Sequence, residues 1–230
     1  ESMDIFTNNH PTKFLHQLVS GQLDVDRLDY LSRDSFFTGV SEGIIGTERI
    51  IKMLNVAEGN LVAEVKGIYS IEKFIISRRL MYWQVYLHKT VIAAEQLLVK
   101  ILQRAEYLVK NGSNINVSDN LRLFLENYFT LEEYKRNSIL LDTFAQLDDN
   151  DIMFNNKIWQ NNADFILSVL SKNLINRQLF HVEIQDESFS DEIIHERTLQ
   201  VCKKYNVSVE EASYFVFSDK ISNKTYSAQG

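Results

Sequence analysis

Forty consecutive residues, numbers 71–110, contain neither glycine nor proline. Proline occurs once in the chain, at Pro11, and glycine eight times among 230 residues. Within a helix, proline costs about 3 kcal/mol and glycine about 1 kcal/mol relative to alanine. The sequence therefore predicts a mainly α-helical chain. One or two long helices are expected over residues 71–110, ending at Asn111 and Gly112, a typical helix C-cap.

Other patterns predict where further elements lie. Apolar periodicity and capping residues predict additional helices at residues 13–19, 23–35, 48–54, 118–128 and 191–204, and further helices over 148–176. A capping-box pattern at residues 130–133 opens another helix, and a second capping box lies at residues 208–211. Alternating apolar residues predict a short β-hairpin near residues 55–66. Alternation at residues 179–184 and the aromatic run 214–217 predict strands, and hence a small α/β unit at the C-terminus. We expect three domains, residues 1–112, a helical extension over 113–176, and the small α/β unit over 177–230.

The bulk composition excludes several classes of protein. Hydrophobic residues make up 45% of the chain, enough for a substantial core. The net charge of -7 makes nucleic acid an unlikely partner. No apolar run approaches the roughly 20 residues that a membrane helix needs, so we expect no membrane association. The single cysteine, Cys202, allows no intrachain disulfide, which fits a cytoplasmic protein.

Residues 22–34 hold four aspartates, two arginines and a tyrosine. At about 100° per residue, Asp26, Tyr30, Arg33 and Asp34 share one helical face. This face could simply be solvated and carry i,i+4 ion pairs. A solvated face, however, usually carries Glu and Lys, whereas Asp is a poor helix former. The aspartates therefore also suggest a role in holding a cation or a phosphate compound.

A second polar stripe follows within the long helical stretch. Arg78, Tyr82, Tyr86 and Lys89 recur at spacings of four, four and three, which places them on one helical face. Arginine and lysine can donate to phosphate, and tyrosine offers a ring and a hydroxyl. Amphipathic packing with the cations extended to solvent explains the same pattern, so the residues alone leave both interpretations open.

Two segments together resemble a known family. Residues 23–40, LDVDRLDYLSRDSFFTGV, and residues 78–89, RRLMYWQVYLHK, are similar in order and spacing to blocks of HD-domain metal-dependent phosphohydrolases, in particular deoxynucleoside-triphosphate triphosphohydrolases. On this resemblance residues 1–112 correspond to the C-terminal part of an HD domain. The resemblance implies these roles: Asp26 as a metal ligand, Arg27 and Arg78 as phosphate contacts, Tyr30 and Tyr86 beside the sugar, and Asp34 as acceptor from the 3′ hydroxyl.

The family's metal site also uses a histidine and an adjacent His-Asp pair, and no His-Asp dipeptide occurs in this chain. The histidines are His10, His16, His88, His181 and His195. We therefore expect the chain to contain no catalytic residue, to bind no metal by itself and to be inactive alone.

For the full-length protein the resemblance implies a homo-oligomer that uses a divalent metal (Mn, Mg, Fe, Ni or Zn). It would hydrolyse deoxynucleoside triphosphates to nucleoside and triphosphate. Two alternatives stay open. One is a non-catalytic helical module that binds a nucleotide or a partner, and the other is a phosphohydrolase that acts on another phosphoester.

Overall fold

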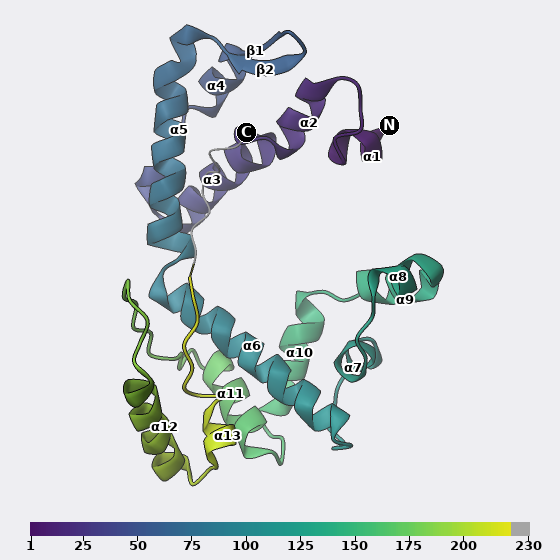
Figure 1. Ribbon diagram of the computed structural model, residues 1–230, viewed down its shortest axis with the longest axis vertical. Coiled ribbons are helices and arrows are strands. Elements are labelled where there is room, and N and C mark those ends of the chain that lie inside the picture. The colour runs from purple at the N-terminus through teal and green to yellow at the C-terminus, as the bar shows by residue number, and fades with distance from the viewer. Residues whose placement is uncertain (222–230) are drawn as a thin grey trace. The chain divides into compact units, whose positions relative to one another are not determined.

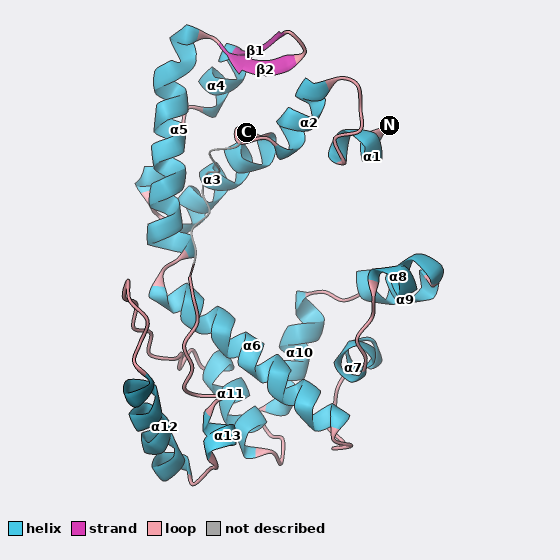
Figure 2. Cartoon of the chain, in the orientation of Figure 1, coloured by secondary structure: helices cyan, strands magenta, loops and turns pink. Residues whose placement is uncertain are grey.

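The computed structural model describes residues 1–221, and most of them lie in helices (Figures 1 and 2). These residues divide into two compact units, one formed by residues 1–88 and residue 221, and the other by residues 89–220. Each unit has its own buried apolar cluster. Among the described residues, no helix combines the length and apolar character needed to cross a membrane.

The first unit is built from five helices and a hairpin. The helices are α1 (Ser2–Phe6), α2 (Lys13–Ser20), α3 (Val25–Thr38), α4 (Thr47–Met53) and α5 (Ile68–Met81). Short 3-10 turns lie at Ser41–Gly43 and Val65–Gly67. The buried apolar cluster joins α3, α4 and α5 through Leu28, Leu31, Ile50, Phe74 and Met81. These positions follow the helical repeat, so the sequence pattern accounts for the buried faces.

The predicted hairpin forms. Strands β1 (Leu54–Ala57) and β2 (Asn60–Ala63) pair in antiparallel register, with Val56 opposite Leu61 (Figure 2). The two connecting residues, Glu58 and Gly59, both have positive φ, at 51° and 77°. Positive φ at both central positions is the geometry of a tight two-residue hairpin turn, and glycine adopts it without strain.

The long glycine-free stretch forms two helices rather than one. After α5 the chain makes a π-helical turn, Tyr82–Tyr86, and α6 (Lys89–Lys110) then begins. The Leu87 N–H donates to the Tyr82 carbonyl at 2.7 Å, five residues back, as a π-helical turn requires. The local change of helical repeat alters the direction of the side chains that follow it.

The second unit packs around α6. Its other helices are α7 (Asp119–Glu126), α8 (Leu131–Arg136), α9 (Ser138–Ala145), α10 (Asp149–Trp159), α11 (Phe165–Ile175), α12 (Asp191–Tyr205) and α13 (Val209–Ala212). Helix α11 packs on α6 and on α10. Leu97, Ile101, Trp159, Leu167 and Leu170 are fully buried in the cluster that these helices share.

Capping residues define several helix starts in the second unit. Thr130 with Glu133, Asp148 with Asp151, and Ser208 with Glu211 each form a complete capping box. Each box satisfies backbone N–H groups that the first turn of a helix leaves without partners.

The strands predicted near the C-terminus do not form. Residues 178–185 have no regular structure, and residues 213–215 make a turn after α13. Within residues 1–221 the sheet consists of β1 and β2. A strand needs a partner for its backbone hydrogen bonds, and alternation in the sequence cannot supply one. Phe180 and Phe217 instead contact each other edge to face, with ring centroids 5.7 Å apart. Residues 222–230 of the predicted α/β unit lie outside the described residues. The three-part domain division stays a prediction.

Candidate functional site

Two aspartates of the acidic segment occupy positions where aspartate stabilises a helix. Asp24 is the N-cap of α3 and accepts from the Arg27 N–H at 2.8 Å, and Asp26 lies in the first turn. Negative charge is favourable at a helix N-terminus. A third, Asp29, is exposed and forms an ion pair with Arg33. The low helix propensity of aspartate therefore does not indicate a ligand role for these three residues. That argument applies to Asp34 alone.

Asp34 joins the two sequence blocks. The hydroxyl of Tyr86, in the π-helical turn, donates to Asp34 Oδ2 at 2.7 Å across 52 residues of sequence. Burial and this hydrogen bond to a carboxylate raise the pKa of Tyr86 above its ordinary value of 10.0. Tyr86 therefore stays protonated at neutral pH and remains a hydrogen-bond donor.

Three tyrosine rings surround this hydrogen bond. Tyr86 meets Tyr30 edge to face at 6.1 Å between ring centroids, and meets Tyr82 in the same way at 5.2 Å. Tyr30 and Asp34 are one helical turn apart on α3, as the periodicity predicted. Tyr82 belongs to the polar stripe 78–89 but was not predicted as a site residue. Tyr82 is four residues from both Arg78 and Tyr86, and this spacing in the sequence could have identified it as a site residue.

Arg78 lies against one of these rings. It is 5% exposed, and its guanidinium carbon lies 5.8 Å from the centroid of the Tyr82 ring, a cation–π distance. Burial and the nearby Tyr82 raise the pKa of Tyr30, and the charges of Arg78 and Arg27 oppose this shift. We call Tyr30, Asp34, Arg78, Tyr82 and Tyr86 the tyrosine cluster.

Arg27 and Asp26 lie at the start of α3. Arg27 is in an ion pair with the N-cap residue Asp24, which is 4% exposed, and it also donates to the Gly21 carbonyl. Its charge is thus partly used in holding the helix start. Asp26 is exposed to solvent. The structure thus brings four of the six predicted site residues into one cluster and leaves Asp26 and Arg27 nearer the N-terminus of α3.

Known proteins resemble this chain over these same elements. Residues 45–124 match the family model for the HD associated region. A solved phosphohydrolase from Bacteroides thetaiotaomicron superposes on 93% of the chain, with 52% sequence identity and a TM-score of 0.89. Together these likenesses support an HD-domain phosphohydrolase.

Two further similar proteins share a lower identity with the chain. The uncharacterised protein YwfO of Bacillus subtilis is 35% identical over 77% of the chain. A deoxynucleoside triphosphate triphosphohydrolase homologue from Dictyostelium discoideum is 27% identical over 47% of the chain. The chain spans 53% of the solved phosphohydrolase, 39% of YwfO and 23% of the Dictyostelium protein.

HD-domain phosphohydrolases generally depend on a divalent metal. Residues 1–221 contain no group of three or more His, Cys, Asp or Glu side chains placed to hold a metal ion. Near Asp26 the other carboxylate, Asp24, is occupied by Arg27. A single exposed carboxylate does not make a metal site, so the described residues do not fit a complete metal centre.

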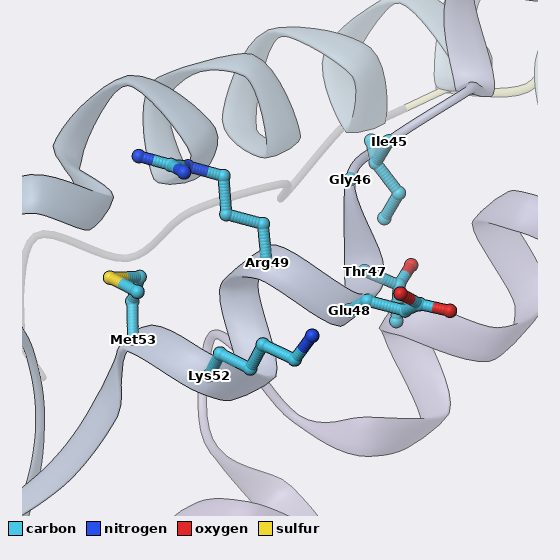
Figure 3. A pocket seen from close by; sticks show the side chains of 7 residues that line it. All are labelled: Ile45, Gly46, Thr47, Glu48, Arg49, Lys52 and Met53. Carbon is cyan, nitrogen blue, oxygen red and sulfur yellow. The ribbon is translucent and has the colours of Figure 1, made fainter.

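A separate pocket lies along α4. Its volume is about 580 Å³, and it is lined by Ile45, Gly46, Thr47, Glu48, Arg49, Lys52 and Met53 (Figure 3). Arg49 is held by a hydrogen bond of 3.1 Å from Nη2 to the Lys66 carbonyl. None of the predicted site residues lines this pocket, so it is distinct from the tyrosine cluster.

Proposed function

We propose that this chain supplies the nucleoside-binding side of an HD-domain active site that hydrolyses deoxynucleoside triphosphates to nucleoside and triphosphate. The observation that carries the proposal is the hydrogen bond of 2.7 Å between Tyr86 and Asp34, which joins α3 to the turn after α5. Support for the substrate class also comes from the Dictyostelium relative, whose name states this activity.

The chemistry of the tyrosine cluster suits a sugar bearing a phosphate. Asp34 can accept from a sugar hydroxyl, and Tyr86 holds that carboxylate in place. The rings of Tyr30 and Tyr86 offer apolar edges against the sugar. The buried charge of Arg78 favours phosphate on the same side. We assign Arg27 a weaker phosphate contact, because Asp24 already neutralises much of its charge.

Asp26 is proposed as one carboxylate ligand of the divalent metal. The remaining ligands of the metal would come from a part of the whole protein outside residues 1–221. No step of the hydrolysis is assigned to residues of this chain. In the whole protein, Asp26→Ala should abolish triphosphate release from a deoxynucleoside triphosphate. Asp29→Ala, three residues further on α3 and exposed, should leave it unchanged. Undiminished turnover in Asp26→Ala would refute the ligand role.

Tyr86→Phe tests the substrate side separately. Losing one hydrogen bond to Asp34 should lower kcat/KM at least tenfold, which corresponds to about 1.4 kcal/mol. The matched control is Tyr128→Phe, which removes a hydrogen bond from a tyrosine to a carboxylate, that of Glu106, at an exposed position in the second unit. Triphosphate release measured at several substrate concentrations separates KM from kcat. Equal kinetics for Tyr86→Phe and the wild type would contradict a role of the tyrosine cluster in binding the substrate.

The same assays separate the alternatives. Hydrolysis of a ribonucleotide or of a phosphodiester in preference to deoxynucleoside triphosphates would favour another phosphoester as substrate. Nucleotide binding that Tyr86→Phe weakens, with no product formed by the whole protein, would favour a non-catalytic binding module. The cytoplasmic location stays a prediction, supported by the acidic charge and the single cysteine.

A further inference from the structure

Tyr82 is the middle residue of a row of three side chains, with Arg78 four residues before it and Tyr86 four residues after it. Arg78 lies on α5, and Tyr82 and Tyr86 are the first and last residues of the π-helical turn. Residues four apart in a helix are neighbours on its surface. Tyr82 therefore lies between the arginine that the proposed function assigns to phosphate and the tyrosine that it assigns to the sugar.

The Tyr82 ring makes a different kind of contact with each of these two neighbours. Its centroid lies 5.8 Å from the guanidinium carbon of Arg78, within the roughly 6 Å of a cation–π contact. It meets the Tyr86 ring edge to face, with 5.2 Å between the two centroids. That contact is closer than the one between Tyr30 and Tyr86, whose centroids are 6.1 Å apart. The Tyr82 ring therefore contacts a residue on each side of the proposed site.

The two tyrosines beside Arg78 restrain its guanidinium in different ways. Arg78 is 5% exposed, and its side chain forms a hydrogen bond with the side chain of Tyr30. That hydrogen bond uses one of the five N–H groups with which a guanidinium can bind phosphate. The cation–π contact with Tyr82 restrains the guanidinium without using an N–H group. Tyr82 can therefore orient the arginine and leave its donors open to a phosphate.

We propose that Tyr82 is a positioning residue whose ring holds the Arg78 guanidinium in the orientation that binds the phosphate of the substrate. The role belongs to the ring, because cation–π attraction comes from the ring and not from the hydroxyl. An arginine that is already held in place loses less conformational freedom when phosphate binds, so its affinity for phosphate is higher. This role rests on the proposed function in one respect, the assignment of Arg78 to phosphate.

The experiment is isothermal titration calorimetry of the whole protein with inorganic triphosphate, which measures binding without turnover. Tyr82→Leu removes the ring and should weaken triphosphate binding about tenfold. Tyr82→Phe keeps the ring and should bind triphosphate as the wild type does. The matched control is Tyr107→Leu, which removes a half-exposed ring 5.0 Å from the guanidinium carbon of another buried arginine, Arg104. It should leave triphosphate binding unchanged, and circular dichroism checks that each variant folds.

A double-mutant cycle with Arg78→Gln separates positioning from a direct contact with the substrate. If Tyr82 acts through Arg78, Tyr82→Leu should weaken triphosphate binding about tenfold in the wild type and less than about twofold in Arg78→Gln. A ring that touched the substrate itself would give the same loss in both backgrounds.

A second titration, with a deoxynucleoside, does not require that Arg78→Gln folds. A deoxynucleoside carries no phosphate, so Tyr82→Leu should change its affinity less than about twofold. A loss of deoxynucleoside affinity as large as the loss of triphosphate affinity would show that Tyr82 acts through Tyr86, and would refute its role on the phosphate side.

The role of Tyr82 would also be overturned by a wild type that binds no inorganic triphosphate, by a Tyr82→Leu variant that binds it normally, or by a Tyr82→Phe variant that binds it as weakly as Tyr82→Leu. Failure of this role is distinguishable from failure of the proposed function. Triphosphate release from a deoxynucleoside triphosphate, together with normal triphosphate binding by Tyr82→Leu, would refute the role and keep the function. Triphosphate binding that depends on Tyr82, in a whole protein that hydrolyses no deoxynucleoside triphosphate, would refute the function and keep the role.

Discussion

The two units use buried arginines differently. In the second unit Arg104 is 7% exposed and makes two hydrogen bonds to Asp164, at 3.1 and 2.6 Å. In the first unit Arg78 is 5% exposed, and it lies beside the Tyr82 ring and hydrogen-bonds with the Tyr30 side chain. Arg104 therefore holds helices together, because Asp164 is also the N-cap of α11. Arg78 lies beside a group of side chains that suits a ligand.

The two units also differ in how many apolar residues they bury. The buried cluster of the second unit includes Trp159 and eleven other residues, whereas that of the first unit has five. Both units also expose large apolar side chains, among them Tyr69 and Trp83 in the first unit and Tyr128 and Ile139 in the second. Apolar burial is the main favourable term in folding. We conclude that apolar burial contributes more to the stability of the second unit than to that of the first.

The largest effect should come from the tryptophans, one in each unit. Trp159 is fully buried, and its Nε1–H donates to the Asn116 carbonyl at 2.7 Å. Trp159→Ala should lower the free energy of unfolding by about 3–5 kcal/mol. Trp83→Ala, at an exposed position, should cost less than about 1 kcal/mol. Urea denaturation followed by circular dichroism measures both, and equal losses would contradict the comparison.

Asp164→Asn should have the next largest effect. Burial works to raise the pKa of Asp164, but hydrogen bonds from Arg104 and the Leu167 N–H more than offset this and lower it. Removing the charge leaves Arg104 buried without its carboxylate, at a cost of about 3 kcal/mol. Asp29→Asn, which breaks an exposed ion pair, is the control and should cost little.

The pH dependence of stability follows from the sign of that shift. A carboxyl whose pKa is lowered by folding stabilises the protein above its unfolded pKa, near 4 for aspartate. The contribution is lost as the pH falls through the lower folded pKa. The stability difference between wild type and Asp164→Asn should therefore be full at about pH 6 and shrink below about pH 4. A difference that does not change with pH would contradict the role of the Asp164 charge.

The smallest effect concerns the first unit. A Cβ on Gly43 would lie 2.7 Å from Ser35 Cβ and 2.8 Å from Met81 Sδ, closer than real contacts allow. Gly43→Ala should therefore cost about 2 kcal/mol by overpacking the contact between α3 and α5. Gly46→Ala, with 3.9 Å to its nearest neighbour, is the matched control. Hydrogen–deuterium exchange should rise in α3 and α5 for the first variant and stay unchanged for the second.

Much of the helical structure was predictable because its signals are local. The capping boxes at Thr130 and Ser208 were recognised from residues three apart, and both form. The two-residue hairpin turn at Glu58 and Gly59 also follows from adjacent residues. The strands at residues 179–184 and 214–217 were wrong, because a strand depends on a partner that adjacent residues do not specify.

The sequence by itself determined which residues share a helical face, since the 3.6-residue repeat is a property of the backbone. It placed Tyr30 with Asp34, and it placed Arg78 with Tyr82 and Tyr86. Only the tertiary structure decided that these two faces meet in the hydrogen bond from Tyr86 to Asp34. It also decided that Arg27 is held by Asp24, its own N-cap. Contacts across 52 residues depend on how helices pack, and packing depends on the shapes of all the buried side chains together.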